Sequence, residues 1–141
     1  MKLEYNIKKI LKKCKHIRKL KKERSLLALL DERGRIKVKD FTIESDERSC
    51  ALNYPKALKY IIKKKKYTKV IHIHNHPSNN AFPSRRDMSA STDQFNYFHH
   101  YNIKLIDIII VAPDSYFSFA ERNWEQCSKS IRTRLEKGLL P

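Results

Sequence analysis

Hydrophobic residues recur along this chain with the spacings of both helices and strands. Near the N-terminus, apolar side chains follow one another at intervals of three and four from residue 7 to residue 20, with lysines between them. This spacing predicts an amphipathic helix whose apolar stripe docks on the rest of the domain. Short runs rich in apolar and β-branched residues predict strands at residues 25–31, 36–44, 68–74, 103–112 and 116–120.

Three further helices are predicted from their start and stop signals. Pro55 suits the first turn of a helix that ends in a block of lysines. Ser84, followed three residues later by Asp87, forms a capping pair for a helix that continues to residue 101. A last helix is expected over residues 123–138, where a glycine ends it. The residues expected on the inward faces of the last two helices are Met88, Ser91, Phe95, Phe98, Trp124, Cys127, Ile131 and Leu135.

The alternation of strands and helices predicts an α/β fold. The length of 141 residues fits one domain. We expect a mixed, largely antiparallel sheet that is flanked by helices. Within residues 36–44 the apolar residues change from even to odd positions, which predicts a β-bulge near Lys39 and Asp40.

The chain is strongly basic, and its charge is unevenly distributed. It holds 31 Lys and Arg against 15 Asp and Glu, a formal net charge of +16. Eleven of the basic residues fall within residues 1–24, and consecutive lysines occupy residues 63–66. Such a field attracts polyanions, so the N-terminal helix is a candidate contact for nucleic acid or for an acidic protein. A solvated helix face without a partner accounts for the same lysines.

Composition excludes several classes of protein. Two glycines are too few for the common phosphate-binding loops. Cys14, Cys50 and Cys127 form no Cys-x-x-Cys pair, which argues against a disulfide framework and favours a reducing compartment. No apolar run approaches the roughly 20 residues that span a bilayer, and no secretory signal follows the basic N-terminus. We therefore expect a cytoplasmic protein that has no membrane partner.

One strand and the loop after it carry the candidate chemistry. His74 and His76 are separated by one residue at the end of the predicted strand, so both imidazoles project to the same side. Asp87, at the start of the following helix, can add a carboxylate oxygen. Two nitrogens and one oxygen leave the fourth tetrahedral position of a zinc ion open for water, as in catalytic zinc sites. These ligand types predict zinc first and another divalent metal second.

The spacing His-x-His, seven residues, Ser, two residues, Asp resembles the motif of the JAMM, or MPN-plus, metalloproteases. The segment HNHPS…PSRRD, the apolar strand before residues 116–121 and Glu23 ahead of the first strand resemble the RadC-like JAB branch in particular. The resemblance implies a JAB/MPN-like domain over residues 23–121. It leaves outside a basic amphipathic helix at residues 1–22 and a helix at residues 122–141 that packs on the domain.

The resemblance also implies an activity, the hydrolysis of peptide bonds or of the isopeptide bonds in ubiquitin-like conjugates. In that family a glutamate ahead of the first strand holds the metal-bound water, which assigns this role to Glu23. Ser84 would donate a hydrogen bond to the oxyanion of the tetrahedral intermediate. Glu44 is the rival of Glu23, because its loop lies near the same region. The implied cofactor is Zn²⁺, bound by the two histidines and Asp87.

Two other functions stay open at the level of sequence. A nucleic-acid-associated protein of the DNA-repair type would act through the basic helix, with a metal site that is structural or vestigial. A metal-free MPN scaffold would lack the ligands that this chain keeps.

The chain departs from the family pattern around the site. Asn79 stands where RadC-like proteins usually have glycine, and asparagine also tolerates a left-handed backbone. Asp107-Ile108 stands where relatives commonly have Asp-His, and residues 45–47 replace the usual Gly-Thr. His72 projects to the same face of the strand as His74, so it is either a buried strand residue or a neighbour of the metal ligands.

Overall fold

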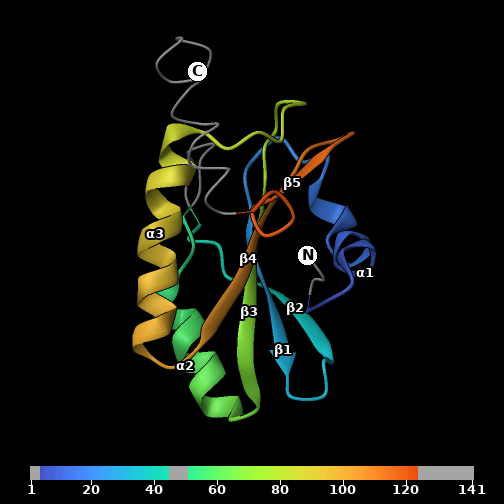
Figure 1. Ribbon diagram of the computed structural model, residues 1–141. Helices are drawn as coiled ribbons and strands as arrows, with labels where there is room; N and C mark the ends of the chain where they lie inside the picture. The colour runs from blue at the N-terminus through green and yellow to red at the C-terminus, as the bar shows by residue number, and fades with distance from the viewer. Residues whose placement is uncertain (1–3, 45–50, 124–141) are drawn as a thin grey trace.

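A five-stranded mixed β-sheet lies between helices on its two faces (Figure 1). The computed structural model describes residues 4–44 and 51–123. The strands are β1 (Ser25–Asp31), β2 (Ile36–Asp40), β3 (Tyr67–Asn75), β4 (Lys104–Val111) and β5 (Tyr116–Ser118). The helices are α1 (Ile7–Lys13), α2 (Tyr54–Lys64), α3 (Arg85–His100) and a short 3₁₀ helix, η1 (Lys15–Ile17). The α/β class predicted from the sequence is confirmed.

The strand order is β2-β1-β3-β4-β5, and one pairing differs from the others. β1 pairs antiparallel with β2 and with β3, and β4 pairs antiparallel with β5. β3 and β4 are parallel, because α3 carries the chain from the end of β3 back to the start of β4. The sheet is therefore mixed and largely antiparallel, as predicted. The carboxyl end of a strand that begins such a crossover is a frequent place for a functional site.

Alternate residues of the central strands face two separate hydrophobic cores. In β1, Leu27 and Leu29 face the core under α2 and α3, whereas the residues beside them face the core under α1. β1 is consequently apolar at successive positions, as in other strands that are covered on both faces. In β3, His72 and His74 have the same parity as Val70, which places them on the α3 side of the sheet.

The N-terminal helix docks on the sheet but is shorter than predicted. The residues that it and η1 bury against β1, β3 and β4 are Ile10, Cys14 and Ile17. α1 ends at Lys13, however, and Leu20 is 40% exposed. Lysines four residues apart along this segment repel one another and weaken a longer helix. Arg18 instead anchors the segment, because its guanidinium donates to the carbonyl oxygens of Ala112 and Ser115 at 2.9 and 3.0 Å.

Strand β2 is shorter than predicted, and the expected bulge is wrong. Its pairing with β1 continues without a shift from Ile36, opposite Leu30, to Asp40, opposite Leu26. Phe41 follows the strand and packs into the core under α2 and α3. The change of parity in the sequence therefore reflects a sheet that is covered on both faces, with no extra residue in the strand.

The inward face of α3 agrees with the prediction at Met88, Ser91 and Phe98 but not at Phe95. Ser91, Gln94 and Phe98 are buried, but Phe95 is 46% exposed and its ring stacks on that of His99. A polar residue takes the inward position because Gln94 hydrogen-bonds a buried histidine of β3. At this one position a tertiary contact overrides the apolar stripe that the sequence suggested.

The remaining described elements lie within two residues of their predicted bounds. Residues 45–47, which replace the usual Gly-Thr of the family, and the predicted C-terminal helix beyond residue 123 lie outside the described residues. None of the described helices is long and apolar enough to cross a membrane.

Candidate metal centre

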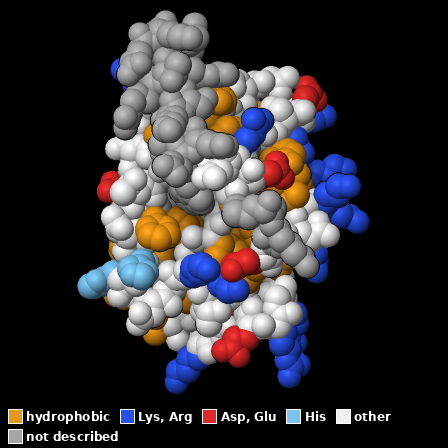
Figure 2. Space-filling model, viewed as in Figure 1, with side chains coloured by type: hydrophobic (Ala, Val, Ile, Leu, Met, Phe, Trp, Pro, Cys, Tyr) orange, Lys and Arg blue, Asp and Glu red, His pale blue; other side chains and the backbone are white. Residues whose placement is uncertain are grey.

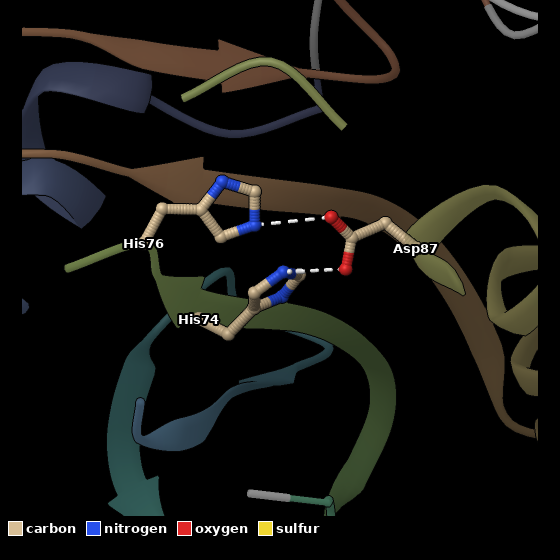
Figure 3. Close-up of side chains that lie close together, drawn as sticks. All are labelled: His74, His76 and Asp87. Atoms are coloured by element: carbon tan, nitrogen blue, oxygen red, sulfur yellow. Dashed lines mark hydrogen bonds and ion pairs between the residues drawn. The ribbon is translucent and has the colours of Figure 1, made fainter. Parts of the chain in front are cut away.

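The three side chains predicted as metal ligands meet at one point of the structure. Figure 3 shows the two imidazole rings facing the two oxygens of one carboxylate. Nε2 of His74 lies 3.1 Å from Oδ1 of Asp87, and Nε2 of His76 lies 3.0 Å from Oδ2. The potential ligand atoms of the three residues all lie within 4.8 Å of one another. Together these side chains can hold one metal ion.

The crossover from β3 to β4 brings these ligands together. His74 lies near the end of β3, and His76 keeps the direction of the strand because its backbone N–H donates to the carbonyl of Val111 at 2.8 Å. Ser84 caps α3, and its Oγ accepts from the backbone N–H of Asp87 at 3.1 Å. In return, the Asp87 carboxylate accepts from the N–H of Ser84 at 2.8 Å. This capping box turns the carboxylate back toward the strand.

The pKa values of the cluster show how its charges are arranged. Burial alone would raise the pKa of Asp87, but its contacts with His74 and His76 outweigh burial and hold that pKa well below its usual range. Burial alone would lower the pKa of His76. Its hydrogen bonds to Asp87 and to the Asn80 carbonyl, together with the charges of Asp87 and Glu23, raise that pKa instead. Asp87 is therefore ionised, the form that a metal ligand requires.

The nitrogen atoms of this cluster fit a metal. Nδ1 of His76 lies 2.9 Å from the carbonyl oxygen of Asn80, which leaves Nε2 directed at Asp87. Both nitrogens of His74 are buried without a hydrogen-bonding partner among the described residues, since its contact with Asp87 lacks hydrogen-bond geometry. Buried polar atoms of this kind cost free energy unless another group binds them. Two imidazoles and a carboxylate suit a divalent ion such as zinc, with a position left for water.

A cavity of about 230 Å³ lies beside the ligands. Glu23 and Ser84, the two residues predicted to act in catalysis, line this cavity together with His74 and Asp87. Arg86 also lines it. The structure therefore brings both predicted catalytic residues to the space that adjoins the metal ligands.

Glu23 reaches the cavity because of the way β1 begins. The first residue of β1 lies opposite His74 in the antiparallel pairing with β3, so Glu23 stands beside the end of β3. The buried side chain of Asn75 holds the backbone on both sides of Glu23. Its Oδ1 accepts from the N–H of Arg24 at 2.6 Å, and its Nδ2 donates to the carbonyl of Lys22 at 2.9 Å. The sequence reasoning missed this role, and the place of Asn75 between the two histidines was the available signal.

Glu44, the rival of Glu23, is engaged in a different contact. Its two oxygens accept hydrogen bonds from the guanidinium of Arg24 at 2.8 and 2.9 Å. These bonds hold the pKa of Glu44 below its usual range, and its side chain is 75% exposed. Glu44 is not among the described residues that line the cavity. The geometry favours Glu23.

Ser84 combines a structural contact with a hydroxyl hydrogen that no described residue accepts. Its Oγ accepts the N–H of Asp87, and this bond does not use the hydroxyl hydrogen. Because Ser84 also lines the cavity, it can cap α3 and donate a hydrogen bond to a group bound there.

The departure at Asn79 is accommodated by its side chain. Asn79 is not among the described residues with positive φ, so its tolerance of a left-handed backbone is not used. Its Nδ2 donates to Oδ2 of Asp114 at 2.9 Å, and its Oδ1 accepts from the backbone N–H of Asp114 at 3.1 Å. This reciprocal pair ties the ligand-bearing loop to the turn between β4 and β5.

Comparison with known families agrees with this architecture. Residues 5–124 match the model of the RadC-like JAB domain. The chain belongs to the RadC-like JAB family. The match begins at residue 5, so it includes α1, which the motif resemblance had left outside the RadC-like JAB domain. All five predicted site residues lie within the matched segment.

Relatives of this RadC-like JAB chain include bacterial UPF0758 proteins. One from Clostridioides difficile is 31% identical over 105 residues, which cover 74% of this chain and 44% of the relative. One from Shewanella baltica is 37% identical over 71 residues, which cover 50% of this chain and 32% of the relative. One from Acinetobacter baylyi is 33% identical over 89 residues, which cover 63% of this chain and 32% of the relative. The chain spans less than half the length of these relatives.

Zinc should stabilise the native protein through the three ligands. We expect one equivalent of Zn²⁺ to raise the melting temperature of protein first stripped with a chelator, because an ion that binds only the native state opposes unfolding. Zinc at 100 times its dissociation constant would add about 2.7 kcal/mol. His76→Gln should abolish most of the shift, whereas His100→Gln, at an exposed position of α3, should keep it. An unchanged melting temperature of the wild-type protein would contradict the metal centre.

Proposed function

We propose that this chain is a zinc-dependent hydrolase of peptide bonds or of the isopeptide bonds in ubiquitin-like conjugates. The observation that carries the proposal is the position of Glu23 and Ser84 on the cavity beside the three metal ligands. A base, a hydrogen-bond donor and a ligand set with an open position are the parts that metal-assisted amide hydrolysis needs. The resemblance to JAMM metalloproteases supports the same reaction.

Each residue has a separate task in this reaction. Zinc, when bound, supplies a Lewis acid that polarises a carbonyl and lowers the pKa of water toward about 7. Glu23 takes the proton of the attacking water and passes it to the departing amine. Ser84 donates its hydroxyl hydrogen to the carbonyl oxygen as negative charge develops there.

The size of the cavity supports a narrow substrate. Its volume of about 230 Å³ lies below the roughly 300–1,000 Å³ that is usual for small-molecule sites. A space of this size can accept an extended segment of chain but not a folded surface. An extended peptide, or the C-terminal tail of a ubiquitin-like protein linked to lysine, is therefore the substrate class that we propose.

Replacing the proposed base should separate catalysis from metal binding. Glu23→Gln should lower kcat by about 10²–10⁴-fold, because an amide cannot take the proton from water. Bound zinc should stay stoichiometric, because Glu23 is not one of the three ligands. The measurements are cleavage of a random peptide library and of a lysine-linked ubiquitin-like conjugate, with metal analysis of the same samples.

Glu44→Gln is the matched control for this experiment. It removes one of the two acidic partners of Arg24, the other being Asp40, rather than a residue of the cavity, and cleavage should persist. Activity that survives Glu23→Gln but not Glu44→Gln would transfer the role of base to Glu44. A zinc-loaded wild-type protein that cleaves neither substrate would contradict the proposed hydrolase.

Two substitutions at Ser84 should separate helix capping from catalysis. Glycine at an N-cap costs only a few tenths of a kcal/mol relative to serine, so Ser84→Gly should keep the free energy of unfolding nearly constant. It should lower kcat by about 10²–10³-fold, because the donor to the developing oxyanion is removed. Ser84→Thr keeps the hydroxyl and should retain most of the rate. Urea unfolding and rate measurements on both variants test this, and an unchanged rate in Ser84→Gly would remove Ser84 from the mechanism.

A second candidate function is nucleic-acid binding by the N-terminal segment. α1 and η1 turn their apolar residues toward the sheet and leave basic side chains around a groove of about 780 Å³. Lys12, Lys15 and Lys19 line this groove. Figure 2 shows Lys and Arg side chains gathered along the edge of the molecule where α1 lies in Figure 1. In this function the basic segment carries the activity, and the metal site is structural or vestigial.

Salt dependence should reveal such binding. Changing Lys12, Lys15 and Lys19 to Gln should weaken binding to duplex DNA and flatten the plot of log affinity against log salt by up to about 0.9 for each phosphate that is no longer neutralised. In the control variant, the same number of exposed lysines is changed to Gln on α2, at Lys56, Lys59 and Lys63. Equal slopes for the wild-type protein and for the variant changed at Lys12, Lys15 and Lys19 would reject this function. If that variant loses binding to an acidic peptide but keeps its binding to DNA, the surface would be assigned to a protein partner.

A further inference from the structure

The proposed hydrolysis makes no use of His72, although this residue lines the same cavity. His72 is 4% exposed and lies two residues before His74 on the same face of β3. The centroids of the two rings are 5.3 Å apart. Nε2 of His72 and Nδ1 of His74 are both buried, and neither has a hydrogen-bonding partner among the described residues. Two unpaired nitrogens therefore lie on neighbouring rings.

The contact with α3 determines which nitrogen of His72 carries a proton. Nδ1 of His72 lies 2.7 Å from Oε1 of Gln94, and an amide oxygen can only accept a hydrogen bond. Nδ1 is therefore the donor, and Nε2 of the neutral ring carries a lone pair.

The two imidazole ligands differ in what holds their second nitrogen. In His76, Nδ1 lies 2.9 Å from the carbonyl oxygen of Asn80, and Nε2 faces Asp87. In His74, Nε2 faces Asp87 in the same way, but Nδ1 has no carbonyl or carboxylate partner in the described part of the chain. Histidines that bind metals almost always donate their second N–H to an acceptor, which fixes the tautomer and the ring direction.

We propose that His72 is a positioning residue for the metal ligand His74. Because the two atoms are not hydrogen-bonded to each other directly, Nε2 of His72 accepts from Nδ1–H of His74 through one water and so keeps the lone pair of His74 on Nε2, toward Asp87. Gln94 holds His72 in the tautomer that can do this. The inference rests on the proposed metal centre, and it adds to the three ligands a chain of support that continues into α3.

Zinc affinity in two substitutions at His72 tests the proposal. The amide of glutamine replaces the Nε2 end of histidine, whereas that of asparagine replaces the Nδ1 end, so only His72→Gln keeps an acceptor near His74. His72→Asn should weaken zinc binding about 10–100-fold, the usual effect of losing a support of a metal ligand. His72→Gln should stay within a few-fold of the wild-type protein. Equal affinities for the two variants would overturn the proposal.

A double variant keeps the test valid if single changes disturb folding. His72→Leu with Gln94→Leu replaces both partners of a buried hydrogen bond by apolar groups, which is often neutral or stabilising. We expect the melting temperature of the chelated double variant to equal or exceed that of the wild-type protein, while its zinc affinity falls about 10–100-fold. Wild-type zinc affinity in this folded variant would contradict the proposal.

The tautomers can also be observed without metal. Long-range ¹⁵N–¹H NMR spectra of the chelated wild-type protein should show His74 protonated at Nδ1 and His72 protonated at Nδ1. In the double variant, His74 should show a mixture of tautomers. A proton on Nε2 of His74 in the wild-type protein would overturn the proposal even if zinc binds. A wild-type protein that binds no zinc but shows these tautomers would instead contradict the proposed function and leave the link between the two histidines supported.

Discussion

The carboxylate of Asp87 is the group on which the rest of the site depends. One of its oxygens accepts the N–H of Ser84 and contacts His76, and the other contacts His74. A single side chain thus joins the start of α3 to the end of β3. Because the capping box bonds the Asp87 carboxylate to the backbone N–H of Ser84, the first turn of α3 sets the direction of this carboxylate. The three candidate ligands are therefore already close together, an arrangement that would reduce the reorganisation needed to bind a metal.

The sheet supplies the surroundings of this contact through two pairings of β3. Its parallel pairing with β4 requires α3 as the crossover, and its antiparallel pairing with β1 brings Glu23 to the same end. Asn75 then ties the backbone around Glu23 to the strand that carries the ligands. The short segment from His74 to His76 therefore serves two purposes, since its histidines face Asp87 and its asparagine positions the proposed base.

The N-terminal segment belongs to the same structural unit even though its charge suggests a separate role. Its apolar residues complete the core on one face of the sheet, and the hydroxyl of Tyr5 donates to the buried carboxylate of Asp107. The same carboxylate accepts from Oγ of Ser118 at 2.5 Å, which links this segment to β4 and β5. α1 lies on the face of the sheet opposite α3 (Figure 1). A polyanion bound by the lysines of α1 would therefore leave the cavity near α3 accessible.

The α/β class could be predicted from the amino-acid sequence alone, as could the candidate ligands His74, His76 and Asp87 and the capping pair that directs one of them. These features depend on residue spacing within short segments, and that spacing is visible in the sequence. The length of α1, the inward place of Gln94 on α3, and the contrast between Glu23 on the cavity and Glu44 paired with Arg24 depend on contacts between distant segments, which are visible in the folded structure. The inward place of Gln94 did not follow from the apolar stripe, because its partner is a buried histidine on β3. A sequence pattern indicates on which face of its helix or strand a residue lies. The side chains that cover this face come from distant segments of the chain, and they decide the chemistry that the residue can perform.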